Sequence, residues 1–161
     1  LGDALAIAVM KYKKFGNKDF KKLHPAGALG AQLQTAEDLM LTGKKIPFIN
    51  EKLKMKKALN ILSDKKLGVL IIQNNKKKTI GIITDGQIRR YNEKNPDLQF
   101  KIAKEVMTKN PISINKDILA AKALSLMNSK KITSLCVHDK KDKSRTVGIL
   151  HVHDILQSSI G

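Results

Sequence analysis

An internal repeat is the feature of this sequence that most restricts its fold. The segment from about Asp38 to Arg90 recurs from about Glu105 to Gln157, and the copies open on similar phrases, EDLMLTGKKIPFI and KEVMTKNPISI. In both copies apolar residues then follow at spacings of three and four, which is typical of an amphipathic helix. They are Met55, Ala58, Leu59 and Leu62, then Leu119, Ala123, Leu124 and Met127. A unit of roughly 60 residues buries too little surface alone, so we expect the two copies to pack together.

Two short apolar strands follow the helix in each copy. The first copy reads LGVLII and then GIITDG, and the second reads ITSLCV and then GILHVHD. Each copy therefore predicts the order strand, helix, strand, strand, helix, which is an α/β (α+β) fold with a small sheet and two helices. The polar, proline-containing stretch NEKNPD, residues 92–97, disfavours a continuing helix and predicts a linker at 94–100.

The composition indicates a folded protein. At 161 residues and 42% hydrophobic content the chain can build a core, and no run approaches the roughly 18 apolar residues of a membrane span. We therefore expect no membrane partner. The single cysteine, Cys136, lies in the apolar run ITSLCV, which predicts a buried, inert thiol. Together with the lack of an export signal in LGDALAIAVM, it favours a cytoplasmic location.

The net charge of +17 raises the question of nucleic-acid binding, because clustered basic side chains release counterions from phosphates. All of the 31 basic residues except Arg89, Arg90 and Arg145 are lysines, and they are spread along the whole chain. Recognition of phosphates and bases favours arginine, and 4 Phe and 2 Tyr are too few for base-stacking platforms. We therefore expect a solvated basic surface that attracts acidic metabolites, and no nucleic-acid partner.

The tandem repeat resembles a pair of CBS domains, regulatory modules that stack as an intramolecular dimer and can bind a nucleotide-like ligand in the clefts between them. The resemblance implies a first CBS domain at 36–93 and a second at 101–161, joined by the linker at 94–100. Residues 1–35 belong to neither copy. Their opening phrase, LGDALAIAVM, is apolar nearly all round a helical wheel, which is typical of a helix buried in a larger body.

The combination of GDALAIA, F-x-x-x-HPAGALG and DLM is similar to bacterial arabinose-5-phosphate isomerases, with Ala26 where the family has a glycine. That family joins a sugar isomerase (SIS) domain to two CBS domains. It interconverts D-ribulose 5-phosphate and D-arabinose 5-phosphate for the synthesis of Kdo, a sugar acid of lipopolysaccharide. The resemblance implies that 1–35 is the helical C-terminal remnant of a SIS domain. Since there is no initiator methionine, we expect the chain to be a piece of a longer protein.

The same resemblance places His24 at the active-site histidine of the isomerase. Exchange of an aldose and a ketose through an enediol moves protons between neighbouring carbons and oxygens, which suits a histidine that titrates near neutrality. The alternative, that His24 only packs or caps a loop, stays open. A parallel sheet with a serine- and glycine-rich phosphate loop is missing from this sequence. We therefore expect the chain alone to have no isomerase activity, and we expect no cofactor.

In ligand-binding CBS domains the second strand ends in a pattern whose threonine or serine meets phosphate and whose aspartate, three residues later, accepts from ribose hydroxyls. The first copy keeps the threonine, Thr84, but has Gln87 in place of the aspartate. The second copy keeps the aspartate, Asp154, but has His151 in place of the hydroxyl. From this pattern and from the basic side chains beside it, we take these as candidate ligand-binding residues: Thr84, Asp85, Gln87, Arg89, His151, His153 and Asp154.

The split pattern argues against an adenine nucleotide, while Arg89, Arg90 and the two histidines offer positive charge to a phosphate or carboxylate. Because the family serves Kdo synthesis, CMP-Kdo as a feedback regulator is our leading hypothesis. The alternatives are a generic nucleotide-sensing pair and a purely structural pair that holds a homo-oligomer, a dimer or tetramer, together. His151 and His153 share a strand face beside Asp154 but lack a further dedicated ligand, so we expect no physiological metal.

Overall fold

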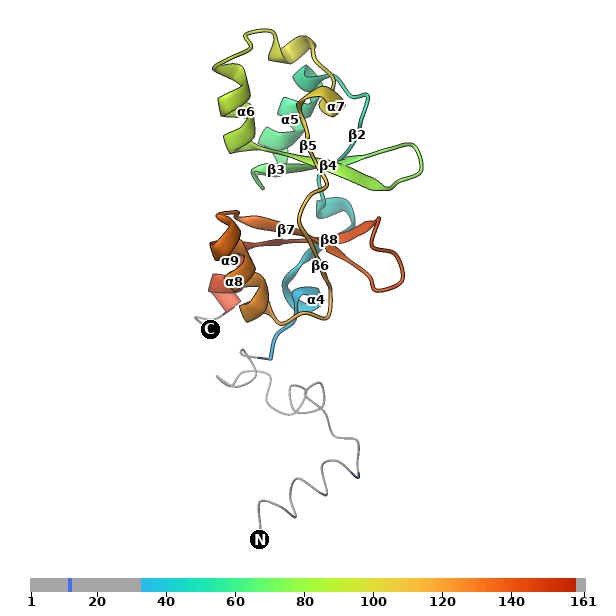
Figure 1. The fold of residues 1–161 in the computed structure, drawn as a ribbon, viewed down its shortest axis with the longest axis vertical. Helices are drawn as coiled ribbons and strands as arrows, with labels where there is room; N and C mark the ends of the chain where they lie inside the picture. Colours follow the sequence, from blue (N-terminus) through green and yellow to red (C-terminus); the bar gives the residue numbers. More distant parts are fainter. Residues whose placement is uncertain (1–11, 13–32, 159–161) are drawn as a thin grey trace.

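The computed structural model describes Tyr12 and residues 33–158 (Figure 1). The predictions made for His24, for the phrase LHPAGALG and for most of the SIS remnant lie outside the described residues. In the described part of the chain, none of the helices combines the length and the apolar character that crossing a bilayer requires.

Two units of the predicted order stack on each other (Figure 1). The first unit contains the strands and helices β2 (Phe48–Asn50), α5 (Met55–Lys65), β3 (Val69–Gln73), β4 (Thr79–Thr84) and α6 (Asp85–Asn92). The second contains β6 (Ser113–Asn115), α8 (Ala120–Lys130), β7 (Ser134–His138), β8 (Thr146–His151) and α9 (Val152–Ser158). The predicted repeat and its α+β class are therefore confirmed.

The two sheets have the same internal pairing. In the first, β3 lies between a parallel neighbour, β2, and an antiparallel neighbour, β4. In the second, β7 lies in the same way between β6 and β8. Both central pairs carry a bulge at the matching place, after Ile72 in one unit and after Val137 in the other. The repeat therefore extends to irregular features of the backbone.

The opening segment of each repeat packs against the other unit. The first repeat opens with α4 (Ala36–Leu39) and β1 (Leu41–Thr42), and β1 pairs antiparallel with β8 of the second unit. The second repeat opens with α7 (Ala103–Val106) and β5 (Thr108–Lys109), and β5 pairs antiparallel with β4 of the first unit. Figure 1 shows α4 beside the second unit and α7 beside the first. The packed units are therefore not segments contiguous along the chain, such as the predicted 36–93 and 101–161, because they exchange α4 and β1 for α7 and β5.

Matching acidic residues begin the two exchanged helices. The Thr35 backbone N–H donates to Asp38 Oδ2 over 2.7 Å, and the Ile102 backbone N–H donates to Glu105 Oε2 over 2.9 Å. Each carboxylate satisfies a backbone donor that the first helical turn leaves without a partner. The repeated acids in the phrases EDLM and KEVM therefore have a structural role in starting these helices.

The core has three parts. The first unit buries the apolar face of α5 under its sheet together with Ala103 and Val106 of the exchanged helix α7. The second unit buries the face of α8 together with Ala36 of α4. A third cluster lies between the units: Ile46, Val69, Ile71, Cys136 and Ile149. The predicted helix faces are correct except at Leu119, which lies at the N-cap of α8 while Ala120 is buried in the cluster. Neither unit has a complete core without the other repeat.

Two further contacts tie the repeats together. At matching positions, Thr79 Oγ1 donates to Thr146 Oγ1 over 2.8 Å, so the openings of β4 and β8 meet across the interface. The predicted linker is also part of the fold, because it contains a short 3₁₀ helix, η2 (Leu98–Phe100), whose Leu98 is buried against the first unit. A second 3₁₀ helix, η1 (Gly43–Lys45), follows β1.

Gly81 in β4 and Gly148 in β8 make room for methionines from the exchanged segments. A Cβ atom at Gly148 would collide with the side chain of Met40, and one at Gly81 would collide with the Met107 sulfur and lie 2.8 Å from the Thr108 carbonyl oxygen. Glycine is therefore required at both positions by close approach of the other repeat.

We predict that Gly81→Ala and Gly148→Ala each lower the free energy of unfolding by about 1–3 kcal/mol, because both overpack a filled contact. At Gly148 the obstacle is side chain alone, so adding Met40→Ala should make the double variant lose less than the sum of the single losses. At Gly81 the Thr108 carbonyl remains, so Met107→Ala should rescue less. Urea unfolding measures these differences.

Gly86→Ala serves as the control, because its Cβ would meet only the end of the Arg90 side chain, at 3.4 Å. It should leave stability nearly unchanged or slightly raised. Equal rescue at both strand glycines would contradict the assignment of their obstacles.

Candidate ligand-binding site

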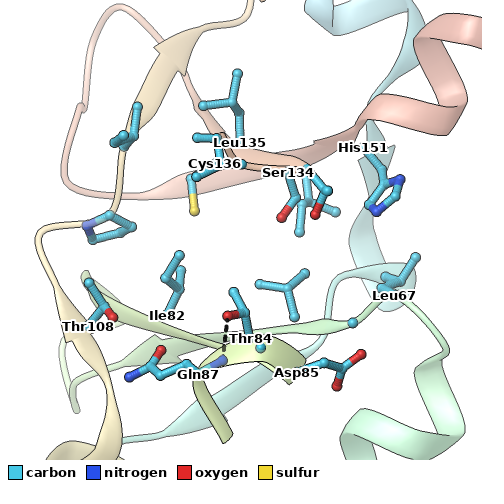
Figure 2. A pocket seen from close by; sticks show the side chains of 18 of the residues that line it. Leu67, Ile82, Thr84, Asp85, Gln87, Thr108, Ser134, Leu135, Cys136 and His151 are labelled. Atoms are coloured by element: carbon cyan, nitrogen blue, oxygen red, sulfur yellow. Dashed lines mark hydrogen bonds between the residues drawn. The ribbon is translucent and has the colours of Figure 1, made fainter. Parts of the chain in front are cut away.

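A cavity of about 760 Å³ lies between the two units. One wall comes from the end of β4 and the start of α6, and the opposite wall comes from β7 and the end of β8. Figure 2 shows Thr84, Asp85 and Gln87 on one side facing Ser134, Cys136 and His151 on the other. The exchanged segment after α7 contributes a third side, with Thr108 and Ile112. The volume falls within the range of small-molecule sites, roughly 300–1,000 Å³.

The middle of the cleft is apolar. Its side chains come from both sheets and include members of the cluster between the units, Val69, Ile71 and Ile149. The buried thiol of Cys136 lies among them, and burial raises its pKa to about 11. The predicted buried thiol is therefore confirmed, and it is protonated and a poor nucleophile near neutral pH.

The charged lining is mostly basic. Lys66, Arg90 and Lys131 carry positive charge, against one carboxylate, Asp85. Hydroxyl groups of Thr84 and Ser134 lie on opposite walls (Figure 2). A cleft with an apolar middle, hydroxyl donors and an excess of positive charge suits a ligand with a flat apolar part and anionic groups.

Thr84 and Gln87 have roles in the fold that bear on recognition. The Gln87 backbone N–H donates to Thr84 Oγ1 over 3.3 Å, so the threonine caps α6. The Gln87 side-chain amide donates to the carbonyl oxygen of Val106, at the end of the exchanged helix α7. Gln87 therefore fastens the exchanged segment, and it lacks the negative charge with which an aspartate accepts from a pair of hydroxyls.

His151 occupies the place in the second unit that Thr84 has in the first. Its Nδ1 accepts from the His153 backbone N–H over 3.3 Å, and the two rings stack with centroids 5.1 Å apart. Its own backbone N–H donates to Asp154 Oδ2 over 3.3 Å. Burial and the neighbouring His153 lower the pKa of His151, while Asp154 raises it less. His151 is therefore neutral near pH 7, which opposes the positive charge expected from the sequence.

Five of the predicted ligand-binding residues line the cleft: Thr84, Asp85, Gln87, His151 and His153. Arg89 and Asp154 do not line it, whereas Arg90 does. Sequence reasoning missed Lys66 and Lys131, although both stand at the same position in the matching phrases SDKKLG and NSKKIT. Within residues 33–158, no three His, Cys, Asp or Glu side chains come together as metal ligands.

Comparison with protein families and curated proteins agrees with this architecture. A family model described as the CBS domain matches residues 36–94 and 103–161. The arabinose 5-phosphate isomerase KdsD of Salmonella typhi is 39% identical over 161 residues, 99% of this chain and 48% of the relative. KdsD of Francisella tularensis subsp. tularensis is 42% identical over 159 residues, 98% of this chain and 47% of the relative. The chain thus spans about half the length of the curated relatives that it matches.

Solved structures share the fold. CBSX2, a CBS-pair protein of Arabidopsis thaliana, superposes in its complex with AMP at a TM-score of 0.69 and 19% identity, over 78% of this chain and 96% of that chain. The CBS domain pair of the protein MJ0100, in complex with 5′-methylthioadenosine and S-adenosyl-L-methionine, superposes at 0.68 and 25% identity, over 78% and 94%. The predicted tandem fold and the resemblance to arabinose-5-phosphate isomerases are confirmed.

We predict that His151 titrates below the ordinary histidine value of 6.5 in an NMR pH titration. Because its pKa is lowered in the folded state, the unfolded chain binds more protons as the pH falls through that value, so stability present above it is lost on acidification. His151→Asn should therefore lose less stability than the parent chain between about pH 7.5 and 5.5. A titration midpoint at or above 6.5 would contradict this assignment.

Proposed function

The chain belongs to the CBS-domain family, and on that premise we propose that it is the regulatory CBS pair of an arabinose-5-phosphate isomerase, in which the cleft binds an anionic small molecule. The observation that carries the proposal is the cleft itself, lined by both units and by the exchanged segment. A ligand in the cleft contacts the two units and the exchanged segment at once. Its binding therefore favours one arrangement of the two units over others, which is what a regulatory module requires.

CMP-Kdo is the ligand we favour. It carries a phosphate and a carboxylate for the cationic side chains of the lining, and a flat base for the apolar middle around Ile71 and Ile149. A pathway product that binds a module attached to an earlier enzyme of that pathway would act as a feedback regulator. The proposal rests on the chemistry of the lining and on the names of the relatives.

An adenosine compound is the second candidate, because the CBS pair of MJ0100 holds 5′-methylthioadenosine and S-adenosyl-L-methionine. The amide of Gln87 argues against it here, since it is bonded to Val106 and carries no charge for ribose hydroxyls. A thermal-shift titration with CMP-Kdo, AMP, ATP and CMP distinguishes these ligands, because a ligand that binds only the folded state raises the melting temperature. No shift with any of them favours a purely structural pair.

The catalytic part of the proposal concerns residues 1–35. We propose that they complete a SIS domain, that His24 belongs to its active site, and that the parent enzyme is a cytoplasmic homo-oligomer serving lipopolysaccharide synthesis. Residues 36–93 and 101–161 would then form the regulatory half. The support is the similarity to KdsD over nearly the whole chain, which includes the phrase HPAGALG.

We predict that Arg90→Gln weakens CMP-Kdo binding about tenfold, since it removes one charge-assisted contact. Arg89→Gln is the matched control, because Arg89 is the neighbouring residue on the same helix, carries the same charge and lies outside the lining. Calorimetric titration at constant ionic strength measures both. Equal losses in the two variants would indicate attraction by the general basic surface and would sink the cleft assignment.

We predict that the chain alone does not convert D-ribulose 5-phosphate to D-arabinose 5-phosphate. In a longer protein with a SIS domain, His24→Ala should lower turnover by about 10²–10⁴-fold, the range of a lost proton-transfer group, while CMP-Kdo binding stays unchanged. A coupled assay for the aldose product follows the reaction. Turnover by the isolated chain would contradict the first expectation, and full activity of the His24→Ala variant would refute the role of His24.

A further inference from the structure

Left-handed backbone conformations gather at the cleft. Among the described residues, four that are not glycine have positive φ: Lys66 at 54°, Lys77 at 58°, Asn110 at 52° and Lys131 at 53°. Three of them, Lys66, Asn110 and Lys131, line the cavity between the units. The fourth, Lys77, lies in the β3–β4 turn. Such strain in residues with side chains tends to collect at functional sites.

Lys66 and Lys131 hold matching positions. Each follows the last residue of the long helix of its unit, α5 or α8, where a left-handed residue closes the helix. Glycine is the residue that suits this position best, because a Cβ atom disfavours positive φ. Both units nevertheless place a lysine there, at a cost in stability. Helix closure alone therefore does not account for these side chains.

The two ammonium groups are free to meet a ligand. Both side chains are exposed, and within residues 33–158 neither has a hydrogen bond or an ion pair. Elsewhere, by contrast, Lys116 bonds Glu37 over 2.9 Å and Asp139 over 3.2 Å. Lys66 also lines a smaller neighbouring cavity of about 340 Å³. The lining thus carries one unpaired lysine from each unit.

We propose that Lys66 and Lys131 form a paired anion site, in which each lysine holds one of two anionic groups on a single ligand that bridges the units. The inference rests on the proposed function, because it concerns the same cleft. It specifies the ligand class as a molecule with two separate anionic groups, either two phosphates or a phosphate and a carboxylate. Neutral nucleosides fall outside this class, and singly anionic molecules bind more weakly.

Pyrophosphate is the probe, because it carries two anionic groups and no base or sugar. The parent chain should bind it more tightly than inorganic phosphate at equal ionic strength. Lys66→Gly and Lys131→Gly should each weaken pyrophosphate binding about tenfold, since each removes one charged contact. The same variants should melt about 2–4 °C higher without ligand, because glycine relieves the left-handed strain.

Two control variants distinguish the effect of the lysine charge from the effect of the left-handed backbone strain. Lys77→Gly relieves the same strain away from the cleft, so it should raise the melting temperature and leave binding unchanged. Lys66→Gln keeps the strain and removes the charge, so it should weaken binding without raising the melting temperature. The two measurements are calorimetric titration for affinity and a thermal melt for stability.

The inference is overturned if the parent chain prefers inorganic phosphate, or if Lys66→Gly and Lys131→Gly bind pyrophosphate as tightly as Lys77→Gly. A CMP-Kdo titration of the same proteins separates this result from the proposed function. If pyrophosphate binding depends on both lysines and CMP-Kdo does not bind, the paired anion site is supported and CMP-Kdo is excluded as the regulator. If CMP-Kdo binds equally well to the parent chain and to both lysine variants, CMP-Kdo is supported as the regulator and the paired anion site is refuted.

Discussion

Each repeat of this chain lends its first helix and strand to the other, and the rest of the structure depends on that exchange. Strand β1 completes the sheet of the second unit and β5 completes that of the first. Ala36 and Ala103 enter the cores that these sheets cover. Because the buried apolar surface of each unit includes residues of the other repeat, the two units form one cooperative structure.

The exchange also builds the cleft. The segment that follows α7 must pass between the units to reach β6, and on its way it contributes Thr108 and Ile112 to the cavity. The Gln87 side chain, from the wall formed by β4 and α6, donates to the carbonyl oxygen of Val106 at the end of α7. The residue that a ribose-binding site would use for its ligand is thus occupied in holding the chain. In the proposed function, recognition depends on the basic side chains of the lining, of which Lys66 and Lys131 have no side-chain hydrogen bond or ion pair within residues 33–158.

The sequence predicted the repeat, the helix faces and the buried Cys136 because each depends on a local pattern of apolar residues. The exchange left no such signal, since the strands β1 and β5 are two residues long and their partners lie far away in the sequence. The strand-end pattern found Thr84 and His151, whereas Arg89, named as a binding residue for its charge, lies outside the cleft. Lys66 and Lys131 were missed because a lysine at a helix end looks like an ordinary surface residue in a chain with so many lysines.

The exchanged strands β1 and β5 are separated from their partner strands by different lengths of chain. This difference sets the order in which the two sheets can form during synthesis on the ribosome. All four strands of the first sheet lie between Phe48 and Lys109, so that sheet can close while the rest of the nascent chain is still being made. The second sheet pairs Leu41 with Ile149, so β1 has to wait until the chain has been made as far as Ile149. Long-range pairing of this kind is slow because a large loop must close first. The second sheet is therefore the last to form, and the cooperative structure is complete only once β1 has paired with β8.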